Sequence, residues 1–188
     1  MNQETSLIGK RRSAAGKDAK ASYANRREEI SQAAIRVFNR LGYKGASVSA
    51  VAAELGIDRA TLYYYFSSKE QMFDEIVRSV LEGNDDLARR IAASAMSPTR
   101  KLRELITSMM ISYAANYPLL YIYIREDLAH VADTRSDWSA QMRALNRSIE
   151  GSIVAIIEQG YADGSFRRVG AERKVAYGIL GMLNWSHR

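Results

Sequence analysis

Residues 47–70 read SVSAVAAELGIDRATLYYYFSSKE, and the most specific fold signal of the sequence lies here. Ser47 is a good N-cap for a helix over residues 48–55, because a serine hydroxyl can accept a backbone N–H of the first helical turn. Gly56 then suits a tight turn that needs a positive φ, and a second helix over residues 59–65 follows at once. Two short helices joined by a glycine turn predict a helix-turn-helix.

The flanking sequence predicts the helices on which this pair would pack. From Ile30 to Leu41 apolar residues recur at helical spacing, and Gly42 stands where a glycine commonly ends a helix. On the other side, Ser67 or Ser68 with the glutamate and glutamine that follow resembles a capping box. We therefore expect a longer helix from this serine pair to about residue 81.

The helix over residues 59–65, which Asp58 can cap, needs one free face if it is to enter a DNA groove. Its outer face carries small or hydrogen-bonding side chains: Arg59, Ala60, Tyr63 and Tyr64. The same pattern also fits an ordinary antiparallel helix pair in a bundle, although such a pair would not need several tyrosines that tolerate exposure.

The stretch from Arg26 to about Phe73, a quarter of the chain, resembles the DNA-binding domain of the TetR family of transcriptional regulators. The matching positions form a long ordered pattern: Ile30, Ala33, Ala34, Phe38, Gly42, Tyr43, Ser47, Val48, Val51, Ala52, Leu55, Gly56, Ile57, the block ATLYYYF at residues 60–66, Ser68, Lys69 and Glu70. The resemblance implies an all-α protein with an N-terminal three-helix DNA-binding domain. It also implies a C-terminal helical domain for ligand binding and dimerisation.

The resemblance also implies roles for individual residues on double-stranded operator DNA. Base edges in the major groove would be contacted by Arg59, Ala60 and Tyr63, and phosphates by Ser47, Ser49, Thr61, Tyr64, Tyr65 and Lys69. Arginine suits a bidentate contact with guanine. For Tyr63 and Tyr65 core packing is the alternative, and for Tyr65 the two interpretations are equally good.

The basic charge is concentrated at the N-terminus. The net charge is +6 with a pI of about 9.6, and residues 1–27 carry seven basic side chains against two acidic ones. Such a segment suggests a polyanionic partner, and without an apolar period it is expected to be a flexible arm over residues 1–25. It either contacts DNA or is a solvated tail. The DNA-binding domain is then expected over residues 26–86 and the ligand-binding and dimerisation domain over residues 87–188.

The composition argues against a metal enzyme and against a membrane protein. Cysteine is absent and the two histidines lie far apart, so no local metal site is predicted and no cofactor is expected. Residues 105–124 carry no charge and could span a bilayer by length, but they contain polar residues and Pro118. We interpret them as two buried helices with a bend. The prediction is a soluble, cytoplasmic protein without a membrane partner.

Helical spacing continues through the second half of the chain. A long helix is expected over residues 138–161 and a last one from about residue 171. The resemblance implies that this pair forms a homodimer through a four-helix bundle, while the same apolar stripes could equally be intradomain core. The chain ends inside an apparent helix, which suggests a C-terminal truncation or a missing final element.

The family resemblance further implies an effector pocket among the middle helices. The candidate lining is apolar with a few hydroxyl tips: Met109, Met110, Tyr113, Tyr117, Tyr121, Tyr123, Trp138 and Met142. Arg125 follows the uncharged run and could pair with a carboxylate or phosphate of the ligand. A hydrophobic small molecule is expected, such as an acyl-CoA or related lipid, because parts of the chain resemble regulators of fatty-acid, acyl-CoA or steroid catabolism. A plain core is the alternative for such a stripe.

Two function classes compete on the sequence alone. The first is a dimeric repressor that an effector releases from its operator, although the sequence does not give the sign of regulation. The second is a helical enzyme or acyl-binding protein with an incidental helix-turn-helix. The best candidates for a catalytic cluster of titratable groups are Glu126, Asp127 and His130. Their spacing is also common on ordinary helix surfaces. We therefore predict a non-enzymatic regulator.

Overall fold

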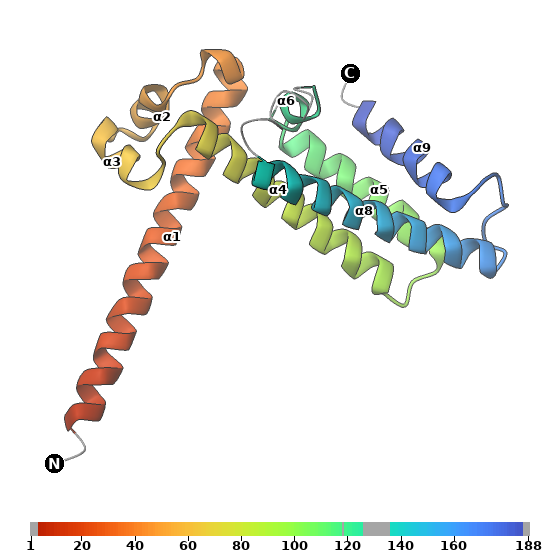
Figure 1. Cartoon of the computed structure of the whole chain (residues 1–188), viewed down its shortest axis with the longest axis horizontal. Coiled ribbons are helices and arrows are strands. Elements are labelled where there is room, and N and C mark those ends of the chain that lie inside the picture. The colour runs from red at the N-terminus through yellow and green to blue at the C-terminus, as the bar shows by residue number, and fades with distance from the viewer. Residues whose placement is uncertain (1–3, 118, 126–135, 186–188) are drawn as a thin grey trace. The chain divides into compact units, whose positions relative to one another are not determined.

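The computed structural model describes the backbone of residues 4–117, 119–125 and 136–185, and the side chains of residues 20–117, 119–124 and 137–185. Every regular element in these ranges is a helix, which confirms the all-α prediction. The helices are α1 (Glu4–Gly45), α2 (Val48–Leu55), α3 (Arg59–Tyr65), α4 (Lys69–Ala93), α5 (Pro98–Ala115), α6 (Leu119–Arg125), α8 (Ser136–Ala162) and α9 (Glu172–Trp185) (Figure 1). The chain divides into an N-terminal unit, residues 1–72, and a C-terminal unit, residues 73–188.

In the N-terminal unit, α2 and α3 lie against the C-terminal part of α1 (Figure 1). The apolar period of α1 forms the floor of this core, and α2, α3 and the residues after α3 cover it. Fully or almost fully buried side chains are Ile30, Ala33, Ala34, Val37, Phe38, Val51, Ala52, Leu62, Phe66 and Met72.

The turns around α2 and α3 match the predicted capping. Ser47 accepts a hydrogen bond from Ala50 N at 3.1 Å, and Asp58 accepts one from Thr61 N at 2.7 Å. Gly56 is left-handed, with φ 64° and ψ 31°. Gly42 has φ 68° and ψ 168°, a conformation open essentially to glycine alone, and it kinks the end of α1. Each turn therefore depends on the residue type that the sequence provides.

The N-terminal segment differs from its expected form. We expected a flexible arm over residues 1–25, but the backbone from Glu4 onward is helical and continuous with the rest of α1. The segment is rich in alanine, lysine and arginine, which are good helix formers, and it contains no proline. The absence of an apolar stripe, which suggested a flexible arm, does not forbid a helix that continues from a packed one.

The stretch from residue 69 to residue 93 also differs from its expected form. The spacing predicts one helix to about residue 81 and a separate short helix near residues 87–95, whereas α4 is a single helix. A lone glycine, Gly83, costs a helix only about 1 kcal/mol, so it does not end one without a proline or a cap. The division between the two units falls after Met72 rather than after the expected residue 86.

The C-terminal unit is built around α8, which packs against both α5 and α9 (Figure 1). Buried isoleucines along α8 form the centre of the core: Ile149, Ile153, Ile156 and Ile157. Leu105 and Met109 of α5 and Ala176 and Ile179 of α9 pack against this row. The core stripe predicted for this long helix is therefore observed within the unit.

A buried lysine joins three parts of the C-terminal unit. Lys101 is only 4% exposed, near the start of α5. Its Nζ donates to the carbonyl oxygen of Ala92 at 2.7 Å and to Oε1 of Gln159 at 2.9 Å. The ammonium thus bonds the end of α4 and the last turns of α8, and its hydrogen bonds offset part of the cost of burying a charge.

The uncharged run over residues 105–124 is divided between α5 and α6, as expected, but α5 is only partly buried, because Met110 and Ile111 are exposed. Pro118 itself lies outside the described residues. In the part of the chain that the structure describes, no helix combines the length and the hydropathy needed to cross a membrane.

Candidate functional site: a helix-turn-helix surface and a C-terminal cavity

The outer face of α3 presents the side chains that the sequence predicts for DNA. Arg59, Ala60, Tyr63 and Tyr64 are exposed, whereas Leu62 on the opposite face is completely buried. The Arg59 guanidinium donates from Nη2 to the Tyr63 hydroxyl at 2.8 Å and lies 5.2 Å from the centre of that ring. The two side chains therefore form one exposed polar pair on this face.

Other predicted contact residues already serve the turn itself. Ser47 and Ser49 are exposed at the start of α2, where the Ser47 hydroxyl accepts the capping bond. Thr61 Oγ1 donates to Asp58 Oδ2 at 2.8 Å. The Thr61 backbone N–H and then its hydroxyl lower the pKa of the Asp58 carboxyl, so the cap stays ionised near neutral pH.

Three tyrosines, Tyr23, Tyr64 and Tyr65, form a cluster between α1 and α3. Tyr65 is half-buried and stacks on Tyr23 at 5.0 Å between ring centres, and Tyr64 meets Tyr65 edge-on at 5.1 Å. Tyr64 is nevertheless 73% exposed. Tyr65 therefore packs against α1, and its hydroxyl role on DNA stays a prediction.

Arg27 fixes the C-terminal end of α3 to α1, and sequence reasoning did not find it. Its Nη1 donates to the carbonyl oxygen of Tyr65 at 2.8 Å, and its guanidinium lies 4.3 Å from the centre of the buried Phe66 ring. An arginine can satisfy an exposed helix-end carbonyl while it stacks on an aromatic face. The only signal in the sequence is a basic residue one turn after Tyr23.

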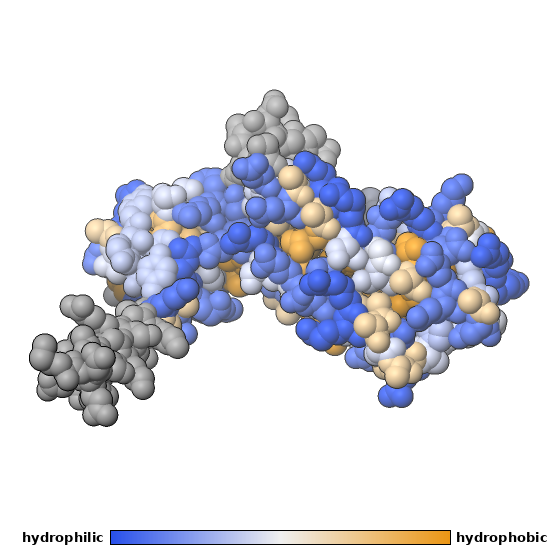
Figure 2. Space-filling model, turned by 60° about the horizontal axis from the view of Figure 1, so that its bottom comes forward, coloured by the Kyte–Doolittle hydropathy of each residue, from blue (hydrophilic) through white to orange (hydrophobic). Residues whose placement is uncertain are grey.

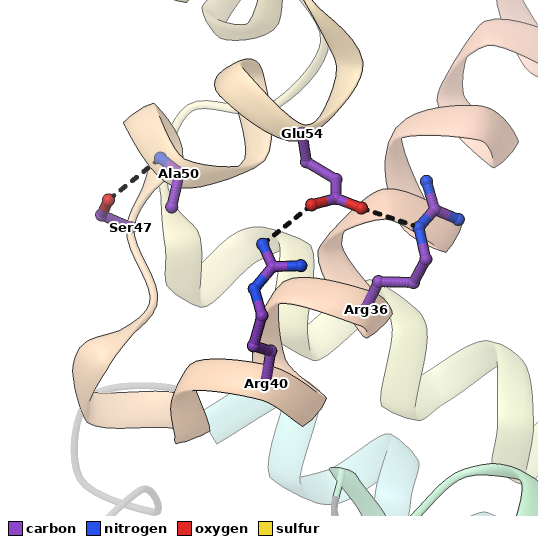
Figure 3. Close-up of polar contacts among 5 residues, drawn as sticks. All are labelled: Arg36, Arg40, Ser47, Ala50 and Glu54. Atoms are coloured by element: carbon purple, nitrogen blue, oxygen red, sulfur yellow. Dashed lines mark hydrogen bonds and ion pairs between the residues drawn. The ribbon is translucent and has the colours of Figure 1, made fainter.

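A second arginine contact, shown in Figure 3, fixes α2 to α1. Arg36 Nε lies 3.0 Å from Glu54 Oε1, and Arg40 Nη2 lies 2.8 Å from Glu54 Oε2. The hydrogen bond from Arg40, and then that from Arg36, lower the pKa of the Glu54 carboxyl below its ordinary value. Both arginines belong to the polar face of α1, so their pairing with a residue of α2 was not predictable from spacing.

Lys69, which is predicted to contact a phosphate, has a partner within the N-terminal unit. Its Nζ donates to the carbonyl oxygen of Tyr43 at 3.0 Å and lies 4.5 Å from the Tyr43 ring centre. The side chain therefore ties the start of α4 to the end of α1. Because an ammonium has three donors, this bond leaves donors for a phosphate.

The C-terminal unit contains a cavity of about 640 Å³, within the size range of small-molecule sites. Residues of α4, α5, α6, α8 and α9 line it, among them Met109, Tyr113 and Tyr123 of the predicted set. The Tyr113 hydroxyl donates to Asn184 Oδ1 at 3.0 Å, and Asn146 Nδ2 donates to the Tyr123 hydroxyl at 3.0 Å. Burial raises the pKa of both tyrosines, so both hydroxyls stay protonated at neutral pH.

The other described residues of the predicted pocket do not line this cavity. Met110 follows Met109 by 100° around α5 and is exposed, and Tyr117 at the end of α5 is also exposed. Tyr121 of α6 is partly buried outside the lining, and Met142 is completely buried in the core. Trp138 Nε1 donates to the carbonyl oxygen of Asp74 at 3.2 Å, which is a contact between α8 and α4.

Some candidate residues lie outside the described part of the chain: Glu126, Asp127, His130 and the side chain of Arg125. Among the residues that are described, no three carboxylates or imidazoles gather in a way that could hold a metal ion. Residues that sequence reasoning missed in the cavity include Asn84, Arg143, Arg147 and Glu150. Of these, Glu150 is buried and accepts from Arg173 Nε at 2.6 Å.

Comparison with known proteins shows to which family this architecture belongs. The family model of bacterial regulatory proteins of the tetR family matches residues 30–76, and a tetracyclin repressor-like C-terminal domain matches residues 95–188. The chain belongs to the TetR family. The two matches cover the helix-turn-helix and most of the C-terminal unit, so the resemblance predicted from residues 26–73 is confirmed and extends to the second unit.

Individual TetR-family members are similar over most of the chain. The HTH-type transcriptional repressor KstR2 of Rhodococcus jostii is 31% identical over 150 residues, which are 80% of this chain and 72% of that protein. The TetR-family regulator PfmR of Thermus thermophilus has a similar structure, with a TM-score of 0.71 and 28% identity over 83% of this chain and 82% of its own. The ketosteroid transcriptional regulator KstR2 of Mycobacterium tuberculosis shares the fold, with a TM-score of 0.70, 24% identity and coverage of 85% and 82%.

Proposed function

We propose that this TetR-family protein is a transcriptional repressor that binds a palindromic operator as a homodimer and is released by a hydrophobic small molecule. The proposal rests on the exposed polar face of α3. The opposite face of the same helix is held in the core by the buried Leu62. A short helix held this way can present side chains to a major groove without losing its own packing. The repressor name of the Rhodococcus jostii relative supports the sign of regulation.

On DNA, Arg59 and Tyr63 are assigned to base edges, together with Ala60. The Arg59–Tyr63 bond holds the guanidinium along the outer face of α3, so less side-chain freedom is lost when it meets a guanine. Ser47, Ser49, Thr61, Tyr64, Tyr65 and Lys69 are assigned to phosphates, which position the helix without reading sequence. The basic N-terminal part of α1 adds further affinity that depends on salt.

The homodimer is assigned to the α8–α9 side of the C-terminal unit. Three large apolar side chains of α9, Tyr177, Met182 and Trp185, are 56%, 68% and 61% exposed. Figure 2 shows apolar side chains reaching the surface of the C-terminal unit among hydrophilic ones. Such residues are commonly covered in a subunit interface. A Met182→Glu variant should lower the dimer fraction in sedimentation velocity, and an unchanged dimer would place the interface elsewhere.

The effector is assigned to the cavity lined by Met109, Tyr113 and Tyr123, and acyl-CoA esters or related lipids are the proposed class. The apolar part of the lining supports a lipid-like ligand. A ligand changes operator affinity only by its differential affinity for the two protein states. A 100-fold release therefore needs about 2.7 kcal/mol of coupling.

Selection of binding sites from random duplexes, with and without a panel of acyl-CoA esters, tests the proposal. The wild type should select a palindrome whose half-sites are about 34–36 Å apart. Arg59→Ala should relax the preference at one position in each half-site by about 1–3 kcal/mol. Arg103→Ala, which removes an exposed arginine of α5, is the control and should leave selection unchanged. The absence of any enriched sequence would refute operator binding.

A further inference from the structure

The helix α3, which carries the proposed base contacts, is short and needs more than one anchor. Its seven residues are about 10 Å long, and its buried side chain, Leu62, lies at the centre. A helix that is held only at its centre can still tilt. A tilt of about 10° would move each end by about 1 Å, which exceeds the range of roughly 0.5 Å over which hydrogen-bond lengths vary. Base contacts from Arg59 therefore require a second point that fixes the direction of α3.

The C-terminal end of α3 provides this second point, because Arg27 of α1 binds it. Arg27 Nη1 donates to the carbonyl oxygen of Tyr65 at 2.8 Å and to the Tyr23 hydroxyl at 3.2 Å. The guanidinium carbon lies 4.3 Å from the centre of the Phe66 ring and 5.8 Å from that of Tyr23. A guanidinium can make both kinds of contact, since its donors lie in its plane and its faces stack on rings.

Tyr23, one turn before Arg27 on α1, packs against the same end of α3. Its ring stacks on Tyr65 at 5.0 Å between ring centres and meets Tyr64 edge-on at 6.0 Å. Aromatic pairs in these arrangements stabilise beyond the area that they bury. Because Tyr23 and Arg27 both contact Tyr65, removal of either side chain should loosen the same end of α3.

We propose that Arg27 and Tyr23 are positioning residues for sequence readout, which fix the direction of α3 so that Arg59 and Tyr63 meet the base edges. Loss of these contacts should weaken binding to the operator. Binding to random DNA depends on phosphate charge and should stay almost unchanged. This inference rests on the proposed operator binding and adds two specificity-determining residues that lie outside the helix-turn-helix.

The ratio of operator affinity to random-duplex affinity tests this role. Fluorescence anisotropy with the full chain compares the palindrome that the wild type selects with a random duplex of equal length. Arg27→Met should lower the ratio about tenfold, because a displaced Arg59 loses a base contact. Arg26→Met is the matched control, since it removes the same charge from the neighbouring position and Arg26 pairs with Glu29 of its own helix. It should weaken both duplexes by the same factor.

Conservative variants separate the contact from the charge. Arg27→Lys keeps the charge but lacks the planar guanidinium, so its ratio should lie nearer to that of Arg27→Met than to that of the wild type. Tyr23→Ala should lower the ratio about threefold, whereas Tyr23→Phe keeps the stacked ring and should stay within about twofold of the wild type. The double variant Arg27→Met with Tyr23→Ala should lose less than the product of the two single losses, because both changes remove one shared contact.

Stability and salt dependence identify the two other roles that Arg27 could have. If Arg27 only stabilised the fold, urea unfolding would show a smaller folded fraction, and both affinities would fall by the same factor. If Arg27 bound a phosphate, the salt slope would fall by about 1 for both duplexes. Either result overturns the inference, as does an unchanged ratio in Arg27→Met or an equal loss in Arg26→Met. A wild type that selects no palindrome would instead refute the operator proposal and this inference together.

Discussion

Leu62 holds the recognition helix on its domain, and Leu62→Ala should destabilise the N-terminal unit selectively. Leu62 is 0% exposed and is the buried residue of the seven-residue α3. A helix of that length is not stable alone, so its order depends on this contact. Buried leucine-to-alanine changes cost about 2–5 kcal/mol, and we expect about 3 kcal/mol here because the short helix can shift to fill part of the space.

A loss of about 3 kcal/mol is large compared with the stability of the N-terminal unit. At about 0.05–0.15 kcal/mol per residue, the N-terminal unit has a stability of roughly 4–10 kcal/mol. With a urea slope of about 1 kcal/mol per M for a unit of this size, the unfolding midpoint should fall by about 3 M. Operator binding should weaken in the same variant, because a larger share of the molecules would lack an ordered α3.

The two tryptophans make the assay selective. Trp138 and Trp185 both lie in the C-terminal unit, and residues 1–72 contain none. Circular dichroism follows both units, so Leu62→Ala should shift part of that transition and leave the tryptophan-fluorescence transition in place. Leu62→Met keeps the volume and should cost less than about 1.5 kcal/mol. Equal shifts of both signals, or a loss below about 1 kcal/mol, would refute the assignment of Leu62 to a separate unit.

The remaining predictions concern the same unit. If Lys69 contacts a phosphate, Lys69→Met should reduce the slope of log affinity against log salt by about 1 for every DNA sequence. A change in stability toward urea without a change in this slope would mean that Lys69 only bonds to Tyr43 and does not contact DNA. The pKa of Glu54 is lowered in the folded state. Its contribution to the free energy of unfolding is therefore present above the pKa of the unfolded state and is lost as the pH falls through the pKa of the folded state. Urea titrations between pH 6 and pH 3 should therefore show a smaller loss of stability in Glu54→Gln than in the wild type, and parallel curves would contradict the ion pairs. Gly56→Ala should destabilise by about 1–2 kcal/mol in the same titration because φ is 64°, and a neutral effect would mean that the turn can relax.

The features predicted correctly from the sequence are those set by neighbours in the chain. Ser47, Gly56 and Asp58 act within a few residues, so their residue types were enough to place the ends of α2 and α3. The family resemblance extended this to a full DNA-binding unit. The predicted length of α4 was wrong, because the change in the apolar pattern beyond Leu81 was taken as the end of a helix that continues to Ala93.

The features that were missed depend on contacts between distant residues. The pairing of Glu54 with Arg36 and Arg40 joins two helices whose facing sides periodicity does not specify. In the cavity, Met109 and Met110 are adjacent in sequence but differ by 100° around α5, so composition could not tell which one lines it. Asn84 gives no signal in the sequence, because only the folded structure shows that it is buried at the cavity.

Lys101 has a consequence for the order in which the C-terminal unit assembles. Its ammonium bonds residues 92 and 159, so the corner between α4 and α5 is completed only when the last turns of α8 arrive from 58 positions along the chain. Before that step the lysine keeps its hydration, because burying it with one bond missing would be costly. The corner should therefore form after the folding transition state, and Lys101→Met should speed unfolding while it leaves the folding rate almost unchanged.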